Sequence, residues 1–219
     1  MPEPLGKNRS DEVLARLESG EAPARLADAL NLDASGLIAA LAHEALEAHR
    51  PALAHAPPRR PRLAAALGEN AWADLLPESV RPARLALAAG LLQVFDFWDA
   101  SHEAAQQADD LGERAISPYW HAIAHRREPD PGNAAYWFRR VGQHPVFPKL
   151  AEAARPLLDG HGDAPLAAKL RNGGRWEPLA MIELCTRAPA GSAAATLAAE
   201  IQRLEMKLLL DATTALVNK

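Results

Sequence analysis

The amino-acid sequence predicts an all-α protein with a multi-helix, bundle-like core and a small N-terminal helical appendage. Alanine and leucine recur at helical spacing through most of the 219 residues, and both residue types favour helices. Alternating runs of Val, Ile, Thr and Tyr, which are typical of strands, are absent. An apolar content of 48% is enough to fill one substantial core.

The apolar periodicity places helices along most of the chain. They are expected at residues 10–19, 22–30, 34–49, 82–110, 118–127, 131–141, 146–158, 176–186 and 193–216. Two starts are well marked, because Ser117-Pro118 and Asp130-Pro131 each put a capping side chain before a proline at the first helical position. Gly142 supplies a helix stop.

Two stretches interrupt this helical pattern. Residues 57–62 read PPRRPR and are predicted to be an extended linker, because prolines remove backbone donors and restrict the residues before them. The linker divides an N-terminal helical segment, residues 1–56, from a main all-α domain, residues 63–219. Glycines and charges at residues 159–174 predict a second, exposed loop.

Charge and composition argue against several classes of function. A net charge of -4 and a pI near 6.1 lack the basic excess of proteins that bind nucleic acid or anionic membranes. The N-terminal segment loosely resembles a helix-turn-helix, but no Lys or Arg lies between Arg25 and Arg50, so DNA binding is not expected. The chain shows no apolar run of membrane-spanning length and no signal-peptide pattern, and its single cysteine, Cys185, fits a cytoplasmic location.

The segment SPYWHAIAHRREPDPGNAAYWFRRVGQHPVF, residues 117–147, concentrates three histidines and four arginines among aromatic residues. His121 and His125 are four residues apart on one helical face, where both rings can converge on one divalent metal ion. The segment lacks the glutamate of H-E-x-x-H metalloproteases, so that mechanism does not apply. A third metal ligand would come from elsewhere: His102, Asp99, Glu128 or His144. The alternative is that the histidines bond to backbone or carboxylates.

A second candidate group lies on the helix expected at 82–110. His102 falls within the apolar arc of that helix, and Asp99 and Gln106 flank it at the i-3 and i+4 positions. All three side chains are expected to face protein rather than water. A carboxylate three residues earlier can orient an imidazole, so the pair is predicted to act as a catalytic base or metal ligand. In the structural alternative, Asp99 and His102 tie the helix to its neighbours.

The helix expected at 131–141 presents Asn133, Tyr136, Trp137 and Arg140 on one face. Flat aromatic surface beside hydrogen-bonding groups suits a small polar or anionic ligand, and Arg140 is expected to stack on Trp137 or to bind a carboxylate or phosphate. The remaining ligand-binding candidates are Gln106, Arg126, Arg127, Glu128 and His144.

Structural roles are the alternative to these binding roles. Arg126 and Arg127 could instead form an ion-pair network with the neighbouring acids Glu128 and Asp130. On the last helix, a heptad-like apolar stripe predicts core packing, with a homodimer seam as the alternative. The stripe consists of Leu197, Ile201, Leu204, Leu208 and Ala215.

The central residues resemble a known signature. FWDASHEAAQ and YWHAIAHRREPDPGNAAYWFRRVGQHPVF together resemble a little-characterised family of bacterial helical proteins with the pattern YWHxxxHRREPDxxNAxYWFRRVGxHPVF. The resemblance covers roughly residues 82–150. It implies a helical fold and one polar constellation, and it implies no particular activity.

Two functional hypotheses follow from these patterns. In the first, the histidines and the aromatic-arginine face form a pocket for a small polar or anionic molecule, which a metal-dependent hydrolase would bind. His102, oriented by Asp99, would then be the base or a ligand. In the second, the same residues form a buried polar network of a non-enzymatic protein-protein interaction module. A pocket leaves such groups in contact with solvent, whereas a network satisfies them internally.

Overall fold

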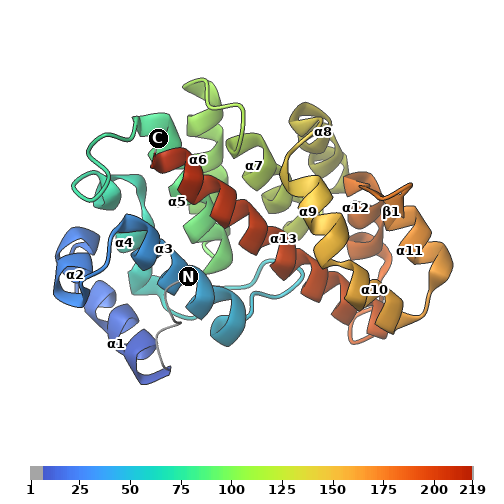
Figure 1. The fold of residues 1–219 in the computed structure, drawn as a ribbon, viewed down its shortest axis with the longest axis horizontal. Coiled ribbons are helices and arrows are strands. Elements are labelled where there is room, and N and C mark those ends of the chain that lie inside the picture. Colours follow the sequence, from blue (N-terminus) through green and yellow to red (C-terminus); the bar gives the residue numbers. More distant parts are fainter. Residues whose placement is uncertain (1–6, 219) are drawn as a thin grey trace.

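The structure is a computed structural model that describes the backbone of residues 7–218 and the side chains of residues 11–218. Within this range all regular secondary structure is helical apart from one short hairpin. This confirms the all-α class (Figure 1). None of the described helices combines the length and the apolar character needed to cross a membrane.

The N-terminal part consists of short helices. These are α1 (Lys7–Glu18), α2 (Pro23–Leu30), α3 (Ala34–His43), the π-helical turn η1 (Glu44–His49), η2 (Pro61–Leu63), α4 (Ala64–Leu67) and η3 (Glu69–Trp72). Asp33 caps α3 by accepting a hydrogen bond from the Gly36 backbone N–H at 2.7 Å. The residues before η2 are non-helical, as the prolines predict.

Longer helices form the centre of the molecule. These are α5 (Arg81–Val94), α6 (Trp98–Asp110), α7 (Ser117–Arg127) and α8 (Pro131–Val141). The C-terminal part contains α9 (Val146–Ala153), α10 (Arg155–His161), α11 (Ala164–Leu170), β1 (Arg171–Asn172), β2 (Arg175–Trp176), α12 (Pro178–Arg187) and α13 (Ala193–Val217). In Figure 1, α13 crosses the molecule diagonally, and it packs against α3, α5, α9, α10 and α12.

The single helix expected over 82–110 is wrong, because the chain breaks at Asp96. Asp96 has a φ of +67°, and the Phe97 N–H donates to the Leu92 carbonyl at 2.9 Å, which ends α5 with a left-handed residue. The Asp96 carboxylate is hydrogen-bonded to Arg127 and lies 2.7 Å from His49 Nε2. These contacts hold the carboxylate in place at the break.

The loop expected at residues 159–174 is also wrong, although most of the stretch is exposed as expected. This stretch contains the end of α10, all of α11 and strand β1. Gly173 and Gly174 join β1 to β2 with φ values of +59° and +83°, which is the geometry of a tight two-residue hairpin turn. The helix expected at 146–158 is likewise divided, into α9 and α10, and Pro156 lies in the first turn of α10.

One hydrophobic core joins the N-terminal segment to the rest of the chain. Leu26 and Leu37 of that segment are fully buried in the same cluster as Leu87 and Leu209. On α13, Leu197 and Ile201 are buried in this core, and Leu204 and Leu208 pack partly buried against it. Four residues of the apolar stripe therefore serve core packing, whereas Ala215 is exposed, and the homodimer stays a prediction.

Helices α5, α7 and α13 pack closely where they meet at Gly90. A Cβ atom at Gly90 would lie 2.8 Å from the Trp120 ring and 2.9 Å from Leu210 Cδ2. Both neighbours are themselves buried. Only glycine therefore allows α5 to pack this closely, although glycine is a poor helix former.

We expect Gly90→Ala to destabilise the fold by about 1–3 kcal/mol, because overpacking outweighs the gain in helix propensity. Urea unfolding measures this change. The matched control is Gly160→Ala in α10, where nothing lies within 4 Å of the added Cβ. That variant should be unchanged or slightly more stable, and equal effects at the two sites would contradict the packing argument.

Candidate metal centre

Helix α7 is buried along its whole length, although it carries His121, His125, Arg126 and Arg127. Buried polar groups need partners, so the contacts of these four side chains define the centre of the protein.

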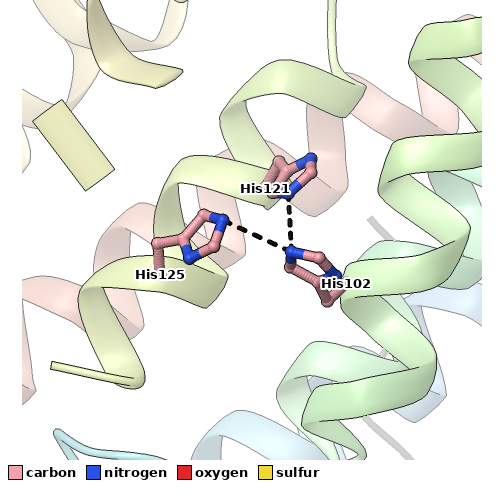
Figure 2. A group of neighbouring side chains, drawn as sticks. All are labelled: His102, His121 and His125. Atoms are coloured by element: carbon pink, nitrogen blue, oxygen red, sulfur yellow. Dashed lines mark hydrogen bonds between the residues drawn. The ribbon is translucent and has the colours of Figure 1, made fainter. Parts of the chain in front are cut away.

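The two histidines of α7 meet His102 of α6, and their Nε2 atoms point toward one another (Figure 2). His121 Nε2 lies 2.8 Å from His102 Nε2, and His125 Nε2 lies 3.3 Å from the same atom. We call His102, His121 and His125 the histidine triad. The three could hold a metal ion, because one ligand atom from each lies within 4.8 Å of the others.

Hydrogen bonds between the three histidines cannot satisfy all three Nε2 atoms. An uncharged imidazole nitrogen carries either one proton or one lone pair, so His102 Nε2 can make a hydrogen bond with only one of its two neighbours. A tetrahedral zinc ion, bound at about 2.0–2.1 Å, separates its ligand nitrogens by about 3.3 Å. The observed separation of 3.3 Å between His102 and His125 matches that value, and the separation of 2.8 Å between His121 and His102 is shorter, so His121 would move outward slightly to admit the ion. One cation between the three Nε2 atoms would satisfy all three lone pairs.

The surroundings favour the neutral imidazoles that a metal requires. His125 Nδ1 lies 2.9 Å from Glu128 Oε2 and donates its proton there, so Nε2 is the nitrogen that faces His102. His121 Nδ1 is buried and has no hydrogen-bond partner among the described residues. Protonating both nitrogens of His121 would therefore bury an unpaired charge.

The pKa values agree with this geometry. Burial lowers the pKa of His121 to about 3, with further lowering by the neighbouring His102, His125 and Arg140. Burial also lowers the pKa of His102, and His125 adds to the shift. Both rings are therefore neutral near pH 7, which is the form that binds metal.

Aromatic rings hold the triad in place. The His121 ring stacks on Trp137, with centroids 3.9 Å apart, and the Arg140 guanidinium lies 5.0 Å from the Trp137 centroid. Trp98 stacks on His102 at 5.3 Å, and its Nε1 donates to the Ala124 carbonyl of α7 at 2.7 Å. Sequence reasoning missed the role of Trp98, although its position four residues before His102 is a usable signal.

Arg126 and Arg127 do not line a pocket. Arg126 forms an ion pair with Glu205 of α13, and both side chains are completely buried. Arg127 pairs with Asp96 and donates to the Gln93 and Ala52 carbonyls at 2.9 and 3.1 Å. A ligand from solvent cannot reach these guanidinium groups, so their expected binding role is wrong. Their partners are also not the neighbouring acids Glu128 and Asp130 that the sequence suggested.

Asp99 does not occupy its expected place. Its side chain is exposed, and no hydrogen bond within the described range joins it to His102, so it does not orient that ring. Gln106 donates to Asp110 at 2.8 Å instead of contacting the triad. The interpretation of Asp99 as a partner turned toward protein is therefore corrected.

The remaining candidates have local structural contacts. Asn133 donates to Asp130 at 2.7 Å at the start of α8, and Tyr136 is half exposed. Arg140 binds both carboxylate oxygens of Asp109 at 3.1 Å. His144 is buried, with Nε2 donating to the Ala115 carbonyl at 3.0 Å and Nδ1 accepting from a backbone N–H at 3.1 Å. Neither nitrogen of His144 is left for a ligand.

The geometry thus defines an all-α protein with a histidine cluster that could bind a metal. Comparison with family models, with curated proteins and with solved structures finds no match.

Acid is expected to destabilise the metal-free protein, because the fold keeps His121 neutral. Its pKa is about 3 in the folded state, against 6.5 for the free side chain. Below about pH 6.5 the folded state thus binds fewer protons than the unfolded state, and stability falls as the pH falls. Between about pH 6.5 and 5 this group alone accounts for a loss of about 2 kcal/mol.

Urea unfolding of chelator-treated protein across this pH range measures the loss. His121→Phe keeps a ring against Trp137 and removes the titrating group, so its stability should depend less on pH. An identical pH dependence in the wild-type protein and the variant would contradict the assignment.

Proposed function

We propose that the histidine triad binds one divalent metal ion of the zinc type and that the protein is a metal-dependent hydrolase of a small polar molecule. The convergence of three Nε2 atoms, with separations of 2.8 and 3.3 Å, carries the proposal. The proposal includes the cytoplasmic location that the single cysteine favours.

The ligand set indicates both the metal and the chemistry. Three imidazole nitrogens suit zinc, and three protein ligands leave a fourth position open, as in catalytic rather than structural zinc sites. A metal bound in this way supplies Lewis acidity to a water molecule or to a carbonyl or phosphoryl group. His102 is half-buried, so the triad has a route to solvent on the α6 side.

Glu128 acts on this centre through His125. Its carboxylate accepts the Nδ1 proton of His125 at 2.9 Å, which fixes the ring orientation and raises the basicity of the opposite nitrogen. Glu128 is therefore a positioning residue. Arg126 and Arg127 fit the structural alternative, a buried polar network without chemistry. Both form buried ion pairs, with Glu205 and Asp96 respectively.

Elemental analysis of protein purified without a histidine tag or chelator tests the metal. We expect about one metal ion per chain. The ion should be lost in the His121→Ala/His125→Ala double variant and kept in the control His43→Ala, whose histidine is exposed and outside the triad. Because His121 is buried, His102→Gln provides a second test with less disturbance of the core. The proposal would be contradicted if the wild-type protein contained no metal and added zinc did not change its melting temperature.

Glu128→Gln is expected to weaken zinc binding by about 10- to 100-fold, because the amide keeps a hydrogen-bond acceptor for His125 but loses the charge. Competition with a chromophoric chelator measures this affinity. Glu152→Gln is the control, since Glu152 is exposed, pairs with Arg155 and belongs to neither group of described residues that could hold a metal. Unchanged affinity in Glu128→Gln would show that the carboxylate does not support the ligand.

A further inference from the structure

A surface pocket of about 490 Å³ lies beside the histidine triad. Two residues of its wall contact the triad directly, since Trp98 stacks on His102 and Glu128 accepts the proton of His125. The rest of the wall comes from the α5–α6 junction and from residues 55–58. Its volume is in the range of small-molecule sites.

The charges in the wall of this pocket have one sign. Its charged residues are Asp96, Asp99 and Glu128, and no Lys or Arg belongs to the wall. Asp96 is already neutralised by Arg127, and Glu128 is engaged by His125. The Asp99 carboxylate is exposed and has no hydrogen bond or ion pair among the described residues. Asp99 is therefore the free charge that a ligand in this pocket would meet.

The arginines expected to attract an anion are directed elsewhere. Arg126 and Arg127 are fully buried in ion pairs, and Arg140 is held by Asp109. An anionic ligand would thus face the Asp99 carboxylate without a compensating guanidinium. A cationic ligand would form an ion pair with it.

The spacing along α6 connects this charge to the triad. Asp99 lies three residues before His102, so the two side chains leave the same face of the helix, with their Cβ atoms about 5–6 Å apart. A small molecule bound at Asp99 is therefore separated from the triad only by the wall residues Trp98 and Glu128, which contact His102 and His125.

We infer that this pocket is the substrate site of the centre and that it selects molecules with an ammonium or amidinium group, which Asp99 binds. The inference rests on the proposed function for the role of the metal. It replaces the anionic substrate that the sequence suggested with a cationic one.

Three probes of the same shape test this selectivity: benzamidinium, benzamide and benzoate. Their dissociation constants are measured by titration calorimetry or ligand-observed NMR with zinc-loaded protein, in mildly alkaline buffer where imidazoles are neutral. We expect benzamidinium to bind about tenfold more tightly than benzamide. Asp99→Asn should reduce that ratio to about one.

Glu103→Gln is the matched control, because Glu103 is exposed on the same helix and is not part of the pocket wall. It should keep the wild-type ratio. Equal or tighter binding of benzamide or benzoate, absence of benzamidinium binding at millimolar concentration, or an unchanged ratio in Asp99→Asn would each overturn the inference. If Asp99 only complements the N-terminus of α6, its removal lowers the melting temperature and leaves the ratio unchanged.

The same titrations separate this inference from the proposed function. If the wild-type protein binds no zinc, the metal centre fails, while the preference for benzamidinium can still be measured on the metal-free chain. If zinc binds with the expected stoichiometry and benzamidinium is not preferred, only the substrate class is wrong.

Discussion

The rest of the structure depends on the burial of α7 together with its two histidines and two arginines. A buried charge without a partner costs several kcal/mol, so the surrounding elements must supply partners for each of these groups. Glu205 on α13 and Asp96 at the end of α5 supply them for the arginines. His102 and Glu128 supply them for the histidines. The arrangement of the helices meets most of these needs, while His121 Nδ1 and some guanidinium nitrogens of Arg126 and Arg127 have no hydrogen-bond partner among the described residues.

This constraint also explains how the N-terminal segment joins the main body. Arg127 donates to the Ala52 carbonyl at 3.1 Å and pairs with Asp96, which in turn lies 2.7 Å from His49. The residue that ends α7, two positions after His125, thus fixes both the break between α5 and α6 and the chain before the proline linker. The histidine triad and the docking of the N-terminal segment share helix α7, so a change at either arginine should disturb both.

The sequence predicts the fold class and most of the helices, because alanine-leucine periodicity, the prolines in the first turns of α7 and α8 and the Asp130 cap are local signals, although Ser117 does not cap α7. It also predicts that His121 and His125 share a face, since that follows from their spacing. The choice of His102 as third member, and of Glu205 and Asp96 as ion-pair partners, depends on contacts between distant segments. No local sequence pattern predicts these contacts. The break at Asp96 also lacks the glycine or proline that usually marks a helix end. Asp99 was misplaced because helical phase was extended through that break.

The central claim is that three imidazole nitrogens hold one metal ion with an open fourth position. X-ray absorption spectroscopy at the zinc edge, on protein loaded with one equivalent of zinc, tests it most directly. The account predicts a four-coordinate spectrum with about three imidazole ligands at about 2.0–2.1 Å and one oxygen ligand, and a smaller imidazole signal in His102→Gln. A six-coordinate, oxygen-only spectrum, or one that His102→Gln leaves unchanged, would contradict it.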